Sequence, residues 1–479
     1  MPPMSAGSSA APRGEADADA GPTQSATTSE VERLRAHVAA LMPRVSEELS
    51  ELVAIPSVAD PRLFPPQECL RAAEWVADRF RGVGFDDVRL AETPDGSSAV
   101  IGSRPCGNPT APTVLLYAHY DVQPALDEKA WRTPPFRLTE VGGRWYGRGA
   151  ADCKGNIVLH LAAVRVLGED VPVNLKLVVE GSEEQGTGGL EAFVPEHADL
   201  LRADAIIVAD TGNAAVGHPG VTVGLRGTVD VVVTVEALAA EVHSGIFGGA
   251  APDALAGLVA MLATLRDDQG NTTVNGLPRI EGWTGAPYPP EQFRRDAGVL
   301  DGVSLLGDGT IADMLWARPA ITIVGIDCPP VVGSAAAIVP RARARLNLRI
   351  PPGVAPQGAA AALVRHLHQV APWQVRVTVD VEASGQPFRA ATDGPAYRVM
   401  AAAMESVYGR PIVELGQGGS IPLCGVLRTT YPEAELILIG VEEPLAAIHA
   451  PNESVHPEEI ADMALTEALF LQNYAAARS

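Results

Sequence analysis

NLKLVVEGSEEQGTGGL, residues 174–190, joins an apolar run to a glycine-rich turn that carries two adjacent acids, Glu183 and Glu184. The run has the length and composition of a buried strand, and the glycines are typical of the turn that ends it. A turn does not need two neighbouring carboxylates, because like charges repel each other. Taken alone, such a pair is usually a solvated surface feature. Its meaning depends on what the other strand ends carry.

Three further apolar runs have the same form, and each leads into polar residues. They are TVLLYAH (113–119), AIIVAD (205–210) and ELILIG (435–440). Helix-like stretches such as NIVLHLAAVRVL (156–167) lie between these runs. A helix capped by Ser29 is expected before the first run, 113–119. Strands that are apolar throughout and alternate with helices predict an α/β fold, with a mixed, largely parallel sheet covered by helices.

The region after Gly224 has a different pattern, in which strand-like and helix-like segments follow the order β-α-β-β-α-β of a ferredoxin-like unit. The strands are expected at 227–237, 320–326, 342–350 and 373–382, and the helices at 252–265 and 358–370. A segment rich in Pro, Gly and Trp, 271–319, interrupts this order. We therefore expect a discontinuous main domain, residues 29–223 and 396–479, with a second domain, 224–395, inserted into it.

The composition argues against several classes of protein. The 479 residues carry a net charge of −22, so the chain should repel nucleic acid and anionic membranes. Five scattered cysteines without a CxxC pair argue against a disulfide framework and favour the cytoplasm. No apolar run has the length of a membrane span. Residues 1–28 lack the apolar core of a signal peptide and are expected to form a disordered tail.

Residues that could bind metal follow several of the expected strands. They are His119 and Asp121, Glu183 and Glu184, Asp210, His449 after an acidic loop, and Asp152 in WYGRGAADCKGN just before a helix. Because the carboxyl ends of parallel strands meet at one edge of a sheet, these side chains are expected to converge. Each alone has an ordinary explanation, such as a turn aspartate or a surface histidine, but an ordered set at successive strand ends rarely arises by chance.

Two imidazoles and several carboxylates form a ligand set that suits Zn²⁺, Mn²⁺ or Co²⁺. Two such ions that share a carboxylate can activate one water between them. Metal cations would also offset the repulsion between Glu183 and Glu184. Adjacent side chains point in different directions, so one glutamate can bind metal while the other serves as general base.

These motifs resemble those of the di-zinc metallopeptidase family that includes carnosine dipeptidases, aminoacylase, acetylornithine deacetylase, succinyl-diaminopimelate desuccinylase and glutamate carboxypeptidases. The similarity is greatest to the dipeptidase branch, and it implies a zinc-exopeptidase-like fold with an inserted lid and dimerisation domain. The matching pieces, in order along the chain, are AHYDVQP, WYGRGAADCKG, EGSEEQGTGG, VAD, GLRG, HSGIFGG, GGSIP and IHAPNE.

The resemblance implies two divalent metal ions, with zinc as the first choice and manganese or cobalt as alternatives. His119 and Asp210 would bind one ion, and Glu184 and His449 the other. Asp152 would bridge both.

The resemblance also implies roles for residues around the metals. Asp121 would orient His119, and Glu183 would take a proton from the bridging water and pass it to the leaving amine. The peptide bond between Asp152 and Cys153 is expected to be cis, although many relatives carry a second acid in place of Cys153.

Four residues are implied on the substrate side. His243 would stabilise the oxyanion, typically by reaching across a homodimer, and would contact the substrate. Arg349 would bind a substrate carboxylate, although other arginines lie near it in sequence. Gly419 and Ser420 would form a substrate-binding turn, although the preceding LGQ lacks the basic residue that many dipeptidase relatives carry.

The resulting hypothesis is a cytoplasmic, homodimeric metallohydrolase that cleaves the amide bond of dipeptides or similar small amino-acid conjugates. A deacylase or desuccinylase of N-acyl amino acids is the nearest alternative, because the metal ligands do not separate the two. A non-catalytic ligand-binding or scaffold protein on the same fold is the alternative from another class. The presence of every expected ligand together with Glu183 argues against it.

Overall fold

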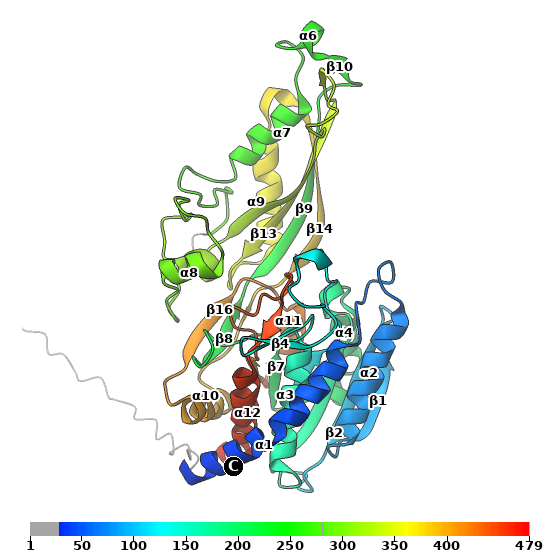
Figure 1. The fold of residues 1–479 in the computed structure, drawn as a ribbon. Coiled ribbons are helices and arrows are strands. Elements are labelled where there is room, and N and C mark those ends of the chain that lie inside the picture. The colour runs from blue at the N-terminus through cyan, green and yellow to red at the C-terminus, as the bar shows by residue number, and fades with distance from the viewer. Residues whose placement is uncertain (1–27, 279–281, 479) are drawn as a thin grey trace, which may run out of the picture.

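The computed structural model describes residues 28–278 and 282–478. A large α/β body carries a smaller layer of strands and helices above it (Figure 1). The tail expected at residues 1–28 lies outside the described residues except for Thr28, where the first helix begins. Ser29, expected as the cap of that helix, is therefore inside it. No helix in the described ranges is long and apolar enough to cross a membrane.

The large body contains one nine-stranded sheet, in the order β1-β2-β6-β3-β7-β17-β8-β15, with β16 paired to β8. Its strands are β1 (Asp86–Glu92), β2 (Ser98–Arg104), β3 (Thr113–His119), β6 (Asn174–Glu180), β7 (Ala205–Ala209), β8 (Gly220–Leu225), β15 (Phe388–Arg389), β16 (Val413–Gln417) and β17 (Glu435–Ile439). The central strands β6, β3, β7 and β17 run parallel, and β1 and β2 extend one side in antiparallel fashion. The predicted mixed, largely parallel sheet is confirmed.

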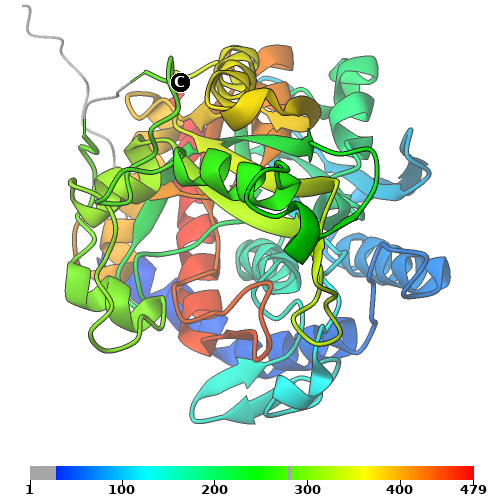
Figure 2. The same cartoon turned by 90° about the horizontal axis from the view of Figure 1, so that it is seen from above.

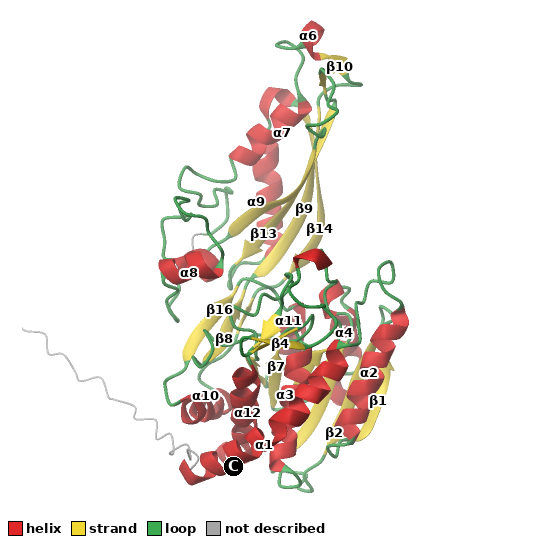
Figure 3. Cartoon of the chain, in the orientation of Figure 1, coloured by secondary structure: helices red, strands yellow, loops and turns green. Residues whose placement is uncertain are grey.

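Helices cover both faces of this sheet (Figure 3). They are α1 (Thr28–Val53), α2 (Pro66–Arg81), α3 (Lys154–Leu167), α4 (Gly189–Glu196), α5 (Ala198–Leu201), α10 (Pro395–Tyr408), α11 (Pro422–Thr430) and α12 (Pro457–Ala477). Alternate residues of β3 enter two different cores: Val114 and Leu116 pack with α1, α3 and α12, whereas Leu115 packs with α4 and α11. Burial on both faces explains why these strands are apolar throughout rather than alternating.

The smaller layer is a four-stranded antiparallel sheet, in the order β11-β13-β9-β14, with two helices on one face (Figures 1 and 2). Its elements are β9 (Gly227–Glu236), α7 (Ala254–Ala263), β11 (Ala320–Asp327), β13 (Arg341–Ile350), α9 (Pro356–Gln369) and β14 (Arg376–Gly385). The predicted ferredoxin-like order is confirmed. The last strand begins later than expected, because Pro372–Gln374 forms a tight turn in which Trp373 has a φ of 53°.

The chain crosses between the two sheets at two short connections. Strand β8 ends at Leu225 and β9 begins at Gly227, while β14 ends at Gly385 and β15, which pairs with β8, begins at Phe388. These crossings lie a few residues inside the proposed limits of the inserted domain, 224–395, which remain a proposal.

The remaining short elements lie in the connections. They are β4 (Thr139–Val141), β5 (Arg144–Tyr146), β10 (Val242–His243), α6 (Ser244–Phe247), α8 (Pro290–Asp296), β12 (Ala337–Ile338) and β18 (Ser454–Val455). The segment 271–319 contains α8 and a π-helical turn, η3 (Asp313–Ala317). Val274 of this segment packs in the core of the smaller layer, whereas Ala286 donates to the backbone oxygen of Glu414 in β16.

Candidate metal centre

The sheet topology brings the five expected metal ligands together. Strands β3 and β7 end at His119 and just before Asp210, and the turn after β6 carries Glu184. The loop after β17 leads to His449, and Asp152 stands two residues before α3. Since the four strands are parallel neighbours, their carboxyl ends meet at one edge of the sheet.

Asp152 lies between the two histidines. Its Oδ1 is 3.0 Å from Nε2 of His119, and its Oδ2 is 3.0 Å from Nε2 of His449. The same His119 atom is 3.1 Å from Asp210, and the same His449 atom is 3.1 Å from Glu184. Two groups of one histidine and one carboxylate therefore share Asp152.

Burial and mutual repulsion make the ionised form of several carboxyl groups in this cluster costly. Burial raises the pKa of the Asp210 carboxyl to about 6. Burial, followed by the charge of Asp210, raises the pKa of Glu183 well above its usual range. Hydrogen bonds to Asp152 and Glu184 raise the pKa of His449 to about 11. A protonated imidazole thus compensates the carboxylates in the chain alone. Divalent cations would compensate them while binding oxygen and imidazole nitrogen, so the donor set fits such ions.

Asp121 fixes the turn that carries the two adjacent glutamates. Its carboxylate accepts the backbone N–H groups of Glu183 at 3.2 Å and of Glu184 at 3.0 Å. Nδ1 of His119 is 3.1 Å from the backbone oxygen of Asp121 and 3.5 Å from its carboxylate. Gln123 donates to the Glu184 carboxylate at 2.8 Å. The segment after β3 therefore positions both a histidine ligand and the paired acids.

Glu453 fixes the loop that carries Asp152, and the sequence analysis did not identify it. Its fully buried carboxylate accepts from Arg148 Nη1 at 2.8 Å and from the N–H groups of Gly149, Ala151 and Asp152 at 3.0, 3.0 and 3.1 Å. The peptide bond between Asp152 and Cys153 is cis, as expected. Glu453 lies within the quoted motif IHAPNE, which was the available signal.

Two further groups approach the metal ligands. A carboxylate oxygen of Glu442 lies within 4.8 Å of oxygens of Asp152 and Asp210, and the Cys153 sulfur lies equally near ligand atoms of His119 and Asp210. Burial raises the pKa of the Cys153 thiol well above its usual value, and Sγ donates to the backbone oxygen of Ala209 at 3.0 Å. Glu442 was also missed, although the acidic pair after ELILIG marks it.

Three of the four residues expected to contact substrate, Arg349, Gly419 and Ser420, lie at or beside a cavity of about 1030 Å³, which is lined by Glu183, Glu184, His449 and Ser420 among others. Arg349 Nη1 is 3.5 Å from Ser420 Oγ, and Gly419 precedes Ser420 in the same turn. The cavity therefore joins the metal ligands to the turn that carries Ser420.

A second arginine, Arg226, accompanies Arg349 and was not identified from the sequence. It is only 8% exposed, and its Nε and Nη1 have no hydrogen-bond partner among the described residues. Burial, with the charge of Arg349, lowers the pKa of Arg226 to about 10. No described carboxylate forms an ion pair with either guanidinium. This arrangement suits an anionic ligand.

The structure does not bring His243 to this centre. His243 lies in β10 at the outer tip of the smaller layer, far from the sheet edge that carries the metal ligands (Figure 1). Its side chain is exposed, and Nδ1 accepts the N–H of Gly245 at 3.0 Å. Within one chain, the site therefore lacks this histidine.

Comparison with known proteins agrees with this arrangement. The model of Peptidase family M20/M25/M40 matches residues 115–473. A cysteinylglycine-S-conjugate dipeptidase of Corynebacterium striatum is 42% identical over 442 residues, covering 90% of this chain and 95% of that protein. A Beta-Ala-His dipeptidase of Rattus norvegicus is 30% identical, covering 86% and 88%. The crystal structure of human carnosine dipeptidase 1 superposes with a TM-score of 0.80 at 26% identity, covering 95% of this chain and all of that one. The chain belongs to the peptidase family M20/M25/M40.

Proposed function

We propose that this chain is a metal-dependent dipeptidase that uses two divalent cations, with zinc as the first choice and manganese or cobalt as alternatives. The observation that carries the proposal is Asp152, whose two oxygens face two separate histidine–carboxylate groups. His119, Asp152 and Asp210 would hold one ion, and Asp152, Glu184 and His449 the other. When bound, such ions polarise a carbonyl and lower the pKa of a water.

Glu183 is the general base in this proposal. Its backbone is fixed by Asp121, and its carboxylate lies in the cavity beside the ligands Glu184 and His449. Burial raises its pKa, which suits a group that accepts a proton and then donates it to a leaving amine. Asp121 acts by holding this turn and His119.

The carboxylate of the substrate would bind to Arg349, with Arg226 beside it and Ser420 and Gly419 in the adjoining turn. The unpaired nitrogens of Arg226 support this assignment, because a buried guanidinium without a partner is costly unless a ligand supplies one. A carboxylate held beside Ser420, which lines the same cavity as Glu183 and His449, favours short substrates over long chains.

The test separates metal binding from proton transfer. Glu183→Ala should abolish turnover of dipeptides while metal content stays near that of the wild type. Asp152→Ala should lose both activity and metal, because it removes the shared ligand. If Glu183→Ala retains most of its activity, the general-base assignment is wrong.

Cysteinylglycine S-conjugates are the first substrates to examine, because the Corynebacterium striatum relative is named for them. The panel should include unsubstituted dipeptides, β-alanyl-histidine and N-acyl amino acids, each with and without chelator. Chelator-sensitive cleavage of free dipeptides would support the proposal. Cleavage confined to N-acyl substrates would identify a deacylase with the same metal ligands.

We also propose a homodimer in which His243 of one copy completes the site of the other. The position of His243 at the tip of the smaller layer supports an arrangement of this kind. The edge strand β11 exposes Ile323, Val324 and Ile326, each at least 43% accessible, which is unusual for an unpaired edge.

Mixed dimers test this arrangement. His243→Ala and Glu183→Ala should each be inactive alone. Co-expressed chains should recover up to about a quarter of the wild-type activity, because half of the random dimers are mixed and each holds one intact site. No recovery in purified mixed dimers would show that His243 does not act across the interface.

A cytoplasmic location completes the proposal. Cys328 is exposed and, like the other cysteines, is a free thiol in this structure. Free thiols of this kind are typical of a reducing compartment. Fractionation of the host cell with a tagged chain would test this directly.

A further inference from the structure

A second cavity, of about 540 Å³, adjoins the one that contains Glu183. Two segments of chain, around residues 417–420 and 448–449, contribute to the walls of both cavities. Gln417 and Ile448 line the second cavity, whereas Ser420 and His449, slightly further along the same segments, line the first. The two cavities thus flank the candidate metal centre.

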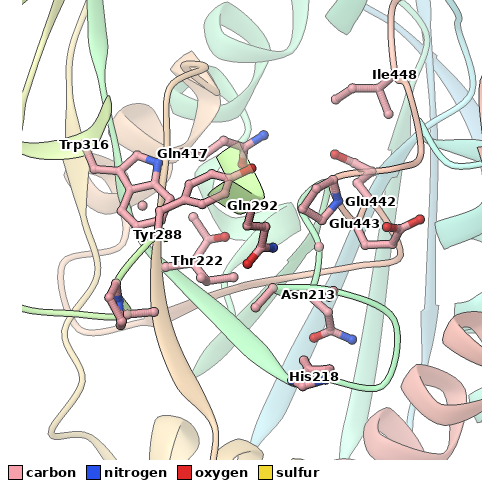
Figure 4. A pocket seen from close by; sticks show the side chains of 18 of the residues that line it. Asn213, His218, Thr222, Tyr288, Gln292, Trp316, Gln417, Glu442, Glu443 and Ile448 are labelled. Carbon is pink, nitrogen blue, oxygen red and sulfur yellow. The ribbon is translucent and has the colours of Figure 1, made fainter. Parts of the chain in front are cut away.

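Glu442 connects the second cavity to the metal ligands. It lines the cavity, and its carboxylate lies within 4.8 Å of oxygens of Asp152 and Asp210. In Figure 4, Glu442, Glu443 and Ile448 lie on one side of the cavity, with Asn213 and His218 below. A ligand in this cavity would therefore reach the edge of the metal centre.

Aromatic rings from the segment 271–319 form the opposite wall. Trp316 and Tyr288, which both line the cavity, stack with ring centres 6.0 Å apart and planes at 25° (Figure 4). Trp283, outside the lining, packs edge-on against Trp316 at 5.2 Å. The Tyr288 hydroxyl donates to Asp296 at 2.7 Å, so its polar end already has a partner. This wall offers ring surface and suits an apolar group.

One polar atom of the cavity wall lacks a partner. Oε1 of Gln417 is buried and accepts no hydrogen bond from any residue that the structure describes. In Figure 4, Gln417 lies beside Trp316 and Tyr288, across the cavity from Glu442, which is the lining residue near the candidate metal ligands. A ligand that carries a hydrogen-bond donor would satisfy Oε1 of Gln417.

We propose that this cavity binds the side chain of the substrate's amino-terminal residue, and that Trp316 and Tyr288 select large apolar or aromatic side chains there. The assignment rests on the proposed dipeptidase function. A dipeptide places one residue on each side of the cleaved bond. With the carboxylate on the Arg349 side, the amino-terminal residue points toward Glu442 and this cavity. The volume lies within the range of small-molecule sites.

The test compares two substrates that differ only in the amino-terminal side chain, phenylalanylglycine and alanylglycine, with metal-loaded enzyme. Trp316→Ala should lower kcat/KM for phenylalanylglycine about tenfold and change that for alanylglycine less than about twofold, because only the larger side chain reaches the ring. Trp373→Ala is the matched control, since Trp373 is 63% exposed and lies outside the cavity.

A second variant covers the case in which Trp316→Ala does not fold. Ala286 lines the cavity, and Ala286→Phe should fill it and again lower the phenylalanylglycine rate selectively. Parallel changes for both substrates, or none, in a folded variant would overturn the cavity assignment. Failure of the wild type to cleave either dipeptide would instead overturn the proposed function, and this assignment with it.

Discussion

Replacement of Glu453 by alanine tests how the loop that carries Asp152 is held. Glu453 is fully buried and accepts four hydrogen bonds, one from Arg148 and three from backbone N–H groups that include that of Asp152. Its removal would leave these donors without an acceptor. The Arg148 side chain, only 1% exposed, would lose its carboxylate.

The expected loss of stability is about 4 kcal/mol, because removing one partner of a buried ion pair costs about 3–5 kcal/mol. Two remaining contacts keep the figure from being larger: Arg148 also donates to Pro124 O at 3.2 Å and lies 5.3 Å from the Trp131 ring. Glu453→Gln should lose about half as much. Its amide oxygen can still serve two donors, whereas its NH₂ group would face the other two.

The assay is equilibrium unfolding of metal-free protein in denaturant, followed by calorimetric titration with Zn²⁺. Metal affinity should fall about 10–100-fold in Glu453→Ala, because Asp152 is no longer positioned. Glu458→Ala is the control, since the Glu458 side chain is 79% exposed and should matter by less than about 0.5 kcal/mol. A loss below about 1 kcal/mol with unchanged metal affinity in Glu453→Ala would refute this reasoning.

Four further predictions concern the large body and the candidate metal centre. Burial raises the pKa of Glu459 from 4.5 to about 7, so its folded state holds the proton more tightly. Stability should fall by about 3 kcal/mol as pH rises from 4.5 through 7, and Glu459→Gln should remove this slope in pH-dependent unfolding. An added Cβ at Gly181 would lie 2.1 Å from the Tyr120 ring, so Gly181→Ala should cost about 1–3 kcal/mol in denaturant unfolding. Gly186→Ala, at a φ of +58° with open space around it, should cost about 1 kcal/mol from backbone strain alone. Zinc binding at pH 7 should release protons, because His449 has a pKa of about 11 and must become neutral to bind the ion. Calorimetry in buffers of different ionisation enthalpy measures the number of protons released. Binding without proton release would contradict the prediction.

The sequence predicted the central strands, and the convergence of the candidate metal ligands at their ends, for the same physical reason. A central strand such as β3 is buried on both faces, so it is apolar throughout, and a polar residue that follows it at once is conspicuous. His119 and Asp210 stand at such ends. The start of β14 was predicted too early, because Trp373 and the valines that follow favour a strand. Pro372 before them is typical of a turn, and the structure forms one there.

The residues that sequence reasoning missed act through distant parts of the chain. Arg226 and Arg349 are 123 positions apart in the numbering, and Glu453 is 301 positions from Asp152. Arg226 and Glu453 lie in the quoted motifs GLRG and IHAPNE, but neither motif shows that the side chain will be buried, since both residue types are usually exposed. Only their common location in the fold shows that Arg226 lacks a partner and that Glu453 has four.

The segment that carries His119 and the segment that carries His449 each hold a loop that presents a carboxylate to the other histidine. Asp121, two residues after His119, holds the turn that presents Glu184 to His449. Glu453, four residues after His449, holds the loop that presents Asp152 to His119. The adjacent acids of the opening stretch therefore stay together because Asp121 binds both of their N–H groups, while their side chains serve different tasks.

An altered Asp121 would disturb the ligands of both groups at once, since it contacts His119 and fixes Glu184. Asp121→Ala should thus weaken binding of both metal ions in a titration, whereas His449→Ala should weaken mainly one. Equal effects of the two variants would show that the reciprocal anchoring has little energetic weight.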